Sequence, residues 1–569
     1  MSDAAAPDAS TDASTTDPDP HVELVRAGYA TAGPAIELGA LLVPGGQPGA
    51  PPAPRPEAAV RLPLATLNRH GLVAGATGTG KTKTLQVMAE QLSDHGVPVF
   101  LADIKGDLSG IAVPGTSSDR LTARTEALGQ DWQPRGRPTE FLALGGIGAG
   151  VPVRATVTSF GPQLLAKVLD LNETQTSSLA LVFHYADTAG LPLLDLADLR
   201  AVVQHLVSDE GKADLEGLGG LSPATAGVIL RELVTFAAAG AEAFFGEPEL
   251  DVADLMRTGD DGRGVVTCLE LAAVQDRPAL FSTFLLWLLA ELFQELPEVG
   301  DLDEPKLVFF FDEAHLLFTD APKAFLTQVV QTVRLIRSKG VGIVFVTQTP
   351  KDVPGDVLAQ LGNRVQHGLR AYTPDDAKAL RATVSTFPRS DYDLEELLTT
   401  LGTGEAVVTV LSERGAPTPV AWTMLRAPEG SMSPAPDDVV AATIAASPLQ
   451  AEYGTAVDRE SAYERLTGRL AAAEPAATPL EPQPEPTPQP SVDLPGPGQG
   501  WDDVPDREPA RTPTRPARRR PTPPAPDPGG PLGDVMGSPA VRSFLRSAGT
   551  VLGREIMRTV LGTARRRRR

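Results

Sequence analysis

The sequence predicts an α/β fold built on a mostly parallel sheet. Three stretches predict it: a glycine-rich turn between an apolar run and a helical segment (71–88), an apolar run that ends in two carboxylates (306–313), and an apolar run that ends in Thr347 and Gln348. Strands buried in parallel sheets read as nearly continuous apolar runs, and ligands bind outside their carboxyl ends. With 569 residues, the chain has room for about two to four domains.

The glycine-rich turn has the form G-x-x-x-x-G-K-T, which is the phosphate-binding loop. Its backbone N–H groups and the N-terminus of the following helix attract a polyphosphate, because both carry positive partial charge. We expect Lys81 to reach the β- and γ-phosphates of ATP and the hydroxyl of Thr82 to bind Mg²⁺. The expected nucleotide-binding residues are Gly75, Ala76, Thr77, Gly78, Thr79, Gly80, Lys81 and Thr82.

The apolar run from Lys306 to Phe311 ends in Asp312 and Glu313, which is the Walker B pattern. In such sites the first carboxylate belongs to the Mg²⁺ shell, and the second orients or deprotonates the attacking water. Gln348, at the end of the next apolar strand, is placed like a sensor that positions water near the γ-phosphate. The sequence therefore predicts Asp312 as a metal ligand, and Glu313 and Gln348 as catalytic residues.

An earlier apolar strand, Val97–Ala102, ends in Asp103, and Asp107 follows in the next loop. Two interpretations of these carboxylates are equally open. They shape the Mg²⁺ environment at the carboxyl edge of the sheet, or they cap the following helix. Glu140–Leu144 and Val153–Ser159 are also predicted to be strands.

Composition and hydrophobic periodicity divide the chain into eight segments. The predicted segments are a disordered tail (1–20), a small N-terminal β element (21–60), the first part of an ATPase core (61–161), an all-α insertion (162–255), the second part of the core (256–430), a helical extension (431–470), a Pro-rich linker (471–531), and a basic amphipathic helix with an arginine tail (532–569). Within the N-terminal element, Val22–Val25 and Ile36–Val43 are expected to be extended.

Charge is distributed unevenly along the chain. The net charge is −22, but the part from Trp501 onward contains 15 Arg against 7 Asp or Glu, a net +8, so the remainder carries −30. An acidic body argues against general coating of nucleic acid. Cys268 is the only cysteine, which excludes an internal disulfide and a cysteine-based zinc cluster. Because we find no signal peptide and no apolar run of about 20 residues, we expect a soluble, cytoplasmic protein.

Four stretches together resemble the HerA-like branch of the HerA–FtsK translocases, and within that branch the bacterial YjgR-type proteins. These stretches are Asn68–Thr82, Phe311–His315, Arg337–Gln348 and Leu361–His367. The resemblance covers about residues 20–470 and the C-terminal helix. It implies a RecA-like core that binds ATP and Mg²⁺, and a homo-oligomer, expected to be a hexameric ring with ATP between subunits.

The resemblance also implies roles for two arginines. An arginine in the position of Arg337 is offered to the γ-phosphate of the neighbouring subunit, and one in the position of Arg69 supports the site in cis. Arg364 and Arg370 are reserve candidates. An arginine of this kind stabilises the charge of the transferring phosphoryl group.

Three functions remain open on the sequence. The first is an ATP-driven motor, a helicase or translocase on double-stranded DNA, whose pore lysines and arginines would track phosphates. Lys105 and Lys167 are candidates, but they are scattered and form no basic stripe. The second is a ring ATPase that acts on protein or membrane-associated cargo, with the basic helix at 532–569 binding an anionic membrane surface or a partner protein. The third is a nucleotide-dependent assembly scaffold.

Overall fold

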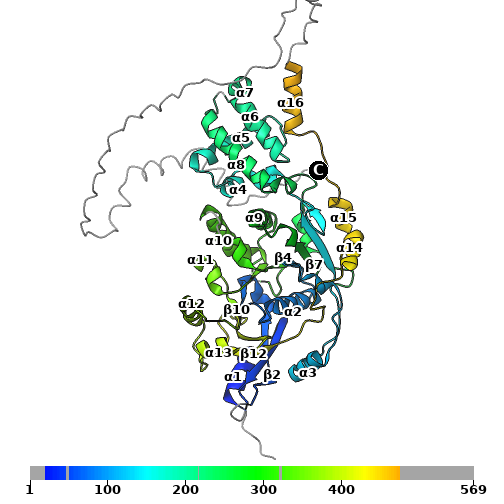
Figure 1. Cartoon of the computed structure of the whole chain (residues 1–569), viewed down its shortest axis with the longest axis vertical. Helices are drawn as coiled ribbons and strands as arrows, with labels where there is room; N and C mark the ends of the chain where they lie inside the picture. Colours follow the sequence, from blue (N-terminus) through cyan, green and yellow to red (C-terminus); the bar gives the residue numbers. More distant parts are fainter. Residues whose placement is uncertain (1–18, 46–49, 216, 301, 319–322, 474–569) are drawn as a thin grey trace, which may run out of the picture. The chain divides into compact units, whose positions relative to one another are not determined.

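The computed structural model describes residues 19–45, 50–215, 217–300, 302–318 and 323–473, and Figure 1 shows the whole chain. The chain divides into two compact units, and all the described residues belong to the first of them, Met1–Pro479. The predicted basic helix at 532–569 lies outside the described residues, as do all but the last few residues of the predicted tail at 1–20 and all but the first few of the predicted linker at 471–531.

The described residues form one sheet of 12 strands. The strands are β1 (Ala35–Val43), β2 (Ala53–Pro63), β3 (Gly71–Ala74), β4 (Val99–Asp103), β5 (Thr139–Leu144), β6 (Val151–Val153), β7 (Val266–Glu270), β8 (Leu307–Phe311), β9 (Val341–Thr347), β10 (Asn363–His367), β11 (Glu405–Thr409) and β12 (Ala421–Leu425).

Helices connect these strands and extend the chain beyond them. They are α1 (Pro20–Gly28), α2 (Lys81–Asp94), α3 (Asp119–Leu128), α4 (Val157–Val168), α5 (Glu173–Thr188), α6 (Leu196–Val207), α7 (Asp209–Asp214), α8 (Pro223–Ala238), α9 (Pro278–Glu295), α10 (Lys323–Ile336), α11 (Gly355–Leu358), α12 (Pro374–Val384), α13 (Leu394–Thr400), α14 (Asp437–Ala446), α15 (Pro448–Tyr453) and α16 (Ala462–Ala473). None of the described helices has the length and apolarity that a membrane crossing requires.

The strands lie in the order β2-β1-β12-β11-β10-β3-β9-β8-β4-β7-β5-β6. All pairs from β10 to β6 are parallel, and all pairs from β2 to β10 are antiparallel. The α/β class with a mostly parallel sheet is therefore confirmed. The N-terminal strands do not stand alone, because β1 pairs with β12 and so joins the main sheet.

The sheet is covered on both faces, and strand β8 shows how. Phe309 and Phe311 pack into one apolar cluster with helices α9 and α10, whereas Val308 and Phe310 pack into a second cluster with helix α2. Successive side chains of a strand point to opposite faces, so a strand buried on both sides must be apolar throughout. This explains the unbroken apolar run that leads to Asp312.

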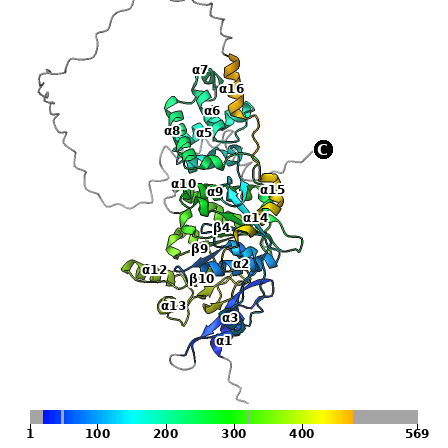
Figure 2. The same cartoon turned by 45° about the vertical axis from the view of Figure 1, so that its right-hand side comes forward.

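The predicted helical insertion is present as helices α4 to α8, of which α5 to α8 lie together in Figures 1 and 2. Side-chain caps fix where its helices begin: Asn172 caps α5 and Asp195 caps α6. The buried residues of the insertion belong to the same apolar cluster as Phe309 and Phe311. The insertion thus shares a core with one face of the sheet.

Two expected strands are wrong. Val22–Val25 lies in helix α1, whose N-terminus is capped by Asp19 and followed by a proline, and which buries Val22 and Val25 on one face. The segment Val153–Ser159 is a strand only up to Val153, because Thr156 caps helix α4 by accepting a hydrogen bond from the N–H of Ser159. In both cases a capping side chain starts a helix inside a run of β-forming residues.

Candidate nucleotide site

The phosphate loop joins strand β3 to helix α2, as the sequence predicts. Gly75, Gly78 and Gly80 have φ angles of 156°, 80° and 115°. A Cβ on Gly75 would lie 2.4 Å from the Cβ of His367. Glycine is therefore required there for conformation and for space.

The backbone N–H groups of Gly75 and Ala76 have another role than the one expected. They donate to the carbonyl groups of Thr347 (3.2 Å) and Gly368 (2.8 Å), which anchors the loop to the ends of β9 and β10. The first N–H groups of a helix have no partner within the helix. The exposed tip at Thr77 and Gly78, together with the first turn of α2, is therefore the part of the loop that is free to hold phosphates.

Lys81 lies in the first turn of α2, and its ammonium donates to the carbonyl of Ala76 over 3.3 Å. Burial lowers the pKa of Lys81, and the charges of Glu313 and Asp312 oppose this shift. The structure thus brings the phosphate loop and the Walker B carboxylates together, although some 230 residues of sequence separate them. Sheet order explains this, because only β9 lies between β3 and β8.

Asp312 is 1% exposed and follows the last residue of β8. Burial raises the pKa of Asp312 to about 6, and the charge of Lys105 opposes the shift. Its Oδ2 atom is buried and forms no hydrogen bond with the described residues. A buried carboxylate oxygen that lacks a hydrogen-bond donor fits a cation ligand.

These residues fit Mg²⁺. Thr82, in the first turn of α2, supplies a hydroxyl, and Asp312 supplies a carboxylate oxygen. Within the described ranges, no group of three or more His, Cys, Asp or Glu side chains is arranged to hold a metal. An ion at this site would therefore depend on phosphate and water oxygens for its other ligands.

Glu313 adopts a left-handed backbone conformation with φ of 46°. Its carboxylate forms an ion pair with Lys105, and its Oε2 atom lies 3.5 Å from Nε2 of Gln348 and 3.2 Å from Nδ1 of His315. Burial acts to raise the pKa of Glu313, but the hydrogen bond and charge of Lys105 outweigh it and hold the pKa below its usual range. The structure thus brings Gln348 to Glu313, at the outer limit of a hydrogen bond.

Sequence reasoning did not assign Lys105 to this site. Lys105 follows strand β4, which pairs directly with β8. The sequence did show a lysine two residues beyond the carboxyl end of a buried strand. Which residues this lysine contacts depends on the order of the strands in the sheet, and the sequence does not give that order. For Asp103, the structure favours the interpretation as a capping loop residue. Its carboxylate accepts hydrogen bonds from the backbone N–H groups of residues 105 to 108 and so holds the loop that follows β4.

The two predicted arginines lie at the opposite edge of the sheet. Arg69 precedes β3, and Arg337 precedes β9, whereas the phosphate loop and Gln348 follow these strands. Buried His70 follows Arg69 in the chain and is near enough to Arg337 to be affected by its charge: burial lowers the pKa of His70 to about 4, and the charge of Arg337 adds to the shift. Four residues of strand span about 13 Å. The expectation that Arg69 supports the phosphate site in cis is therefore not met.

The reserve candidates have other positions. Arg364 lies on β10 opposite Leu72 and donates to the carbonyl groups of Leu361 and Thr386. Arg370 is exposed, lies beyond the carboxyl end of β10, and donates to the hydroxyl of Tyr372. Of the four arginines, Arg370 alone follows its strand at the edge that carries the phosphate loop.

A cavity of about 310 Å³ lies beside the start of helix α2. Its walls come from α2, from α3 and from the chain that follows β12. The lining includes Gly80, Thr84, Leu121, Arg124, Thr403, Gly404, Leu425, Ala427, Pro428 and Met432. The N–H of Gly404 donates to the carbonyl of Thr79 over 2.9 Å, so the cavity adjoins the phosphate loop directly.

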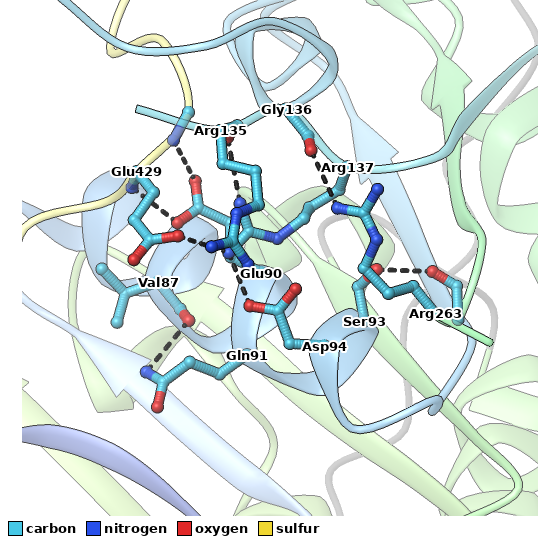
Figure 3. A network of polar contacts seen from close by, with 12 residues as sticks. Val87, Glu90, Gln91, Ser93, Asp94, Arg135, Gly136, Arg137, Arg263 and Glu429 are labelled. Atoms are coloured by element: carbon cyan, nitrogen blue, oxygen red, sulfur yellow. Dashed lines mark hydrogen bonds and ion pairs between the residues drawn. The ribbon is translucent and has the colours of Figure 1, made fainter. Parts of the chain in front are cut away.

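Figure 3 shows how the wall of this cavity is attached to α2. The carboxylate of Glu90 accepts hydrogen bonds from the N–H groups of Glu429 (2.7 Å) and Gly430 (2.9 Å). The buried guanidinium of Arg137 pairs with Asp94 (2.6 Å) and with the side chain of Glu429 (2.8 Å). Burial raises the pKa of Glu90 to about 7, and the hydrogen bonds and Arg137 oppose the shift. Helix α2 therefore holds both the phosphate loop and the cavity wall.

Several solved structures resemble the chain at low identity. The unbound conjugative coupling protein TrwB is 15% identical, with 72% of this chain and 93% of that chain covered and a TM-score of 0.45. TrwB in complex with ADP and Mg²⁺ is 16% identical, with 71% and 98% covered and a TM-score of 0.43. VirB4 of Thermoanaerobacter pseudethanolicus is 14% identical, with 69% and 97% covered and a TM-score of 0.41. None of the curated proteins matches the sequence.

A protein-family model, described as helicase HerA-like C-terminal, matches residues 51–569. The match spans nearly the whole chain and contains the phosphate loop, Asp312, Glu313 and Gln348, which the fold gathers at one edge of the sheet. The chain accordingly belongs to the HerA-like P-loop ATPases.

Proposed function

We propose that the chain is an ATP-hydrolysing HerA-like ring ATPase that works as a motor or translocase on double-stranded DNA. The observation that carries the ATPase part is the meeting of Lys81 with Asp312 and Glu313 at the carboxyl edge of the sheet. Family membership supports nucleotide-driven motor activity. The DNA substrate and the ring are the finer parts of the proposal.

The residues of the chain divide the work at the site. The N–H groups at the loop tip and the ammonium of Lys81 hold the phosphates, and the cavity beside α2 takes the adenosine. Mg²⁺, bound by Thr82 and Asp312, would neutralise phosphate charge. Glu313 accepts a hydrogen bond from the attacking water and takes its proton, while Gln348 fixes the orientation of the carboxylate.

The ring is supported by the positions of the arginines. Arg337 is exposed at the edge where the parallel strands begin, and β9 separates it from the phosphate site of its own chain. An arginine that stabilises the γ-phosphoryl group must contact it. In a homo-hexamer whose subunits set the starting edge of one sheet against the carboxyl edge of the next, Arg337 acts in trans, and Arg69 lies at the same interface.

A second candidate function is a ring ATPase that acts on protein or membrane-associated cargo, or an assembly scaffold. The acidic charge of the chain before Trp501 favours it, because an acidic body repels nucleic acid. In this case the protein remains in the cytoplasm or attaches to the membrane surface.

ATPase assays on the full chain separate these functions. We expect the rate with Mg²⁺ and ATP at low salt to rise when double-stranded DNA is added, and the rate of the Glu313→Gln variant to be lower by about 10²- to 10⁴-fold under both conditions. A rate that duplex DNA leaves unchanged would exclude the DNA motor and favour the cargo function. Absence of ATP turnover both with and without duplex DNA would favour the assembly scaffold. Negative-stain images with ATP and Mg²⁺ test the hexamer.

A further inference from the structure

We propose that Lys105 is a second γ-phosphate-binding lysine, which Glu313 holds in reserve until ATP enters. This inference rests on the proposed ATPase function and adds a step to it. Lys105 exchanges partners from the carboxylate of Glu313 to the γ-phosphate, and the exchange frees Glu313 to accept the attacking water. ADP has no γ-phosphate and leaves the ion pair in place.

Hydrogen bonds hold the main chain at Lys105, while its side chain is partly exposed. Strand β4 pairs with β8 in parallel register, which sets Ala102 beside Phe311. The carboxylate of Asp103 then ties down the following loop, with the N–H groups of Gly106 (2.7 Å) and Leu108 (2.7 Å) bonded to it. The lysine side chain beyond this rigid base is 42% exposed, while that of Glu313 is 7% exposed. The lysine is thus the mobile partner of the pair.

Charge places Lys105 at the position of the phosphates. The ammonium groups of Lys81 and Lys105 act on each other and on the same two carboxylates, Asp312 and Glu313. Asp107 also acts on Lys105 and on Asp312, so the carboxylates of this group outnumber its two ammonium groups. A triphosphate adds negative charge beside Glu313, and its repulsion must be offset. Because Lys105 is the more exposed of the two lysines, its side chain can turn toward the γ-phosphate while its main chain stays in place.

The ion pair also occupies the base. Lys105 bonds to Oε1 of Glu313, while Gln348 and His315 lie at Oε2. A carboxylate whose two oxygens are both engaged is a poor acceptor for the proton of water. Movement of Lys105 to the γ-phosphate frees Oε1 of Glu313 for a water. Ammonium binds phosphate through strong charge-assisted hydrogen bonds, which favours the exchange.

The test compares Lys105→Ala, Lys105→Arg and the control Lys212→Ala, an exposed lysine on helix α7 that pairs with Asp209. Affinities for ADP and for a non-hydrolysable ATP analogue are measured on the full chain with Mg²⁺, together with kcat and KM. One charged hydrogen bond is worth about a 10- to 150-fold change in affinity. We expect Lys105→Ala to lower the affinity for the ATP analogue by at least about 10-fold and the affinity for ADP by less than about 2-fold. We also expect it to lower kcat.

Partial recovery of analogue affinity by Lys105→Arg would support the exchange, because arginine retains the charge. Equal effects of Lys105→Ala on ADP and on the analogue would show that the pair is only structural and would overturn the proposal. So would faster basal turnover, since Lys105 would then only restrain Glu313. If Lys105→Ala fails to fold, the ratio of the two affinities in Lys105→Arg decides. Failure of the unmodified chain to bind the analogue would refute the ATPase function instead.

Discussion

The two edges of one parallel sheet differ in what they do with charge. At the carboxyl edge, buried Asp312 and Glu313 face Lys81 and Lys105, so cations and anions are paired within the chain. At the starting edge, Arg337 is exposed and Arg69 is half-buried. One edge gathers the residues that we propose for phosphate binding and hydrolysis. The other presents cations outward, as a surface that completes a neighbour's site would.

The largest expected effect is at the carboxyl edge. Lys81→Ala should weaken ATP binding by at least about 100-fold, because two charge-assisted hydrogen bonds to phosphate are lost, and it should leave no detectable turnover. Fluorescent-nucleotide titration measures this, with Lys212→Ala as the control. Tight binding by Lys81→Ala would mean that this edge does not hold the phosphates.

Arg337→Ala tests the starting edge. We expect ATP affinity to be kept and turnover to fall by about 10³- to 10⁵-fold, the range for arginines that contact the transferring phosphoryl group. Arg334→Ala, an exposed arginine on α10, is the matched control. Mixing Arg337→Ala with Lys81→Ala subunits should restore part of the turnover, since a mixed ring contains some sites with both residues. No recovery would contradict a site shared between subunits.

Glu313→Gln should keep or strengthen ATP binding, because Lys105 loses its competing partner, and it should lower turnover by about 10²- to 10⁴-fold, the usual contribution of a general base. The side chain keeps its size and loses the charge that attracts Lys105 and accepts a proton. Single-turnover hydrolysis measures the effect. Normal hydrolysis by this variant would show that Glu313 is not the general base.

The smallest effect is on stability, and it concerns the cavity wall next to the phosphate loop. The pKa of Glu90 in the folded chain is raised from 4.5 to about 7. Its stabilising contribution is therefore fully present below about pH 4.5 and is lost as the pH rises through about 7.

Glu90→Gln removes that titration, while the charges around it on Arg137, Asp94 and Glu429 stay the same. We expect the variant to gain about 1–3 kcal/mol relative to the unmodified chain between pH 5 and pH 8, measured by denaturant unfolding at both pH values. A difference that does not change with pH would show that Glu90 stays charged in the folded chain.

The sequence by itself determined the α/β class and the phosphate loop, and it predicted the roles of Asp312, Glu313 and Gln348. These features are local: an apolar run, a glycine turn and the polar residues directly after a strand. Helix caps were missed at Asp19 and Thr156, where one side chain outweighed a β-forming composition.

Only the tertiary structure decided which residues meet. Strand order places β9 between β3 and β8, and β4 on the far side of β8, so that Lys105 reaches Glu313 while Arg69 lies a strand length away from the phosphate loop. It also joins the N-terminal strands to the sheet through β12. Strand pairing is a contact between distant parts of the chain, and a local sequence pattern shows only at which edge a residue lies, not which strand lies beside it.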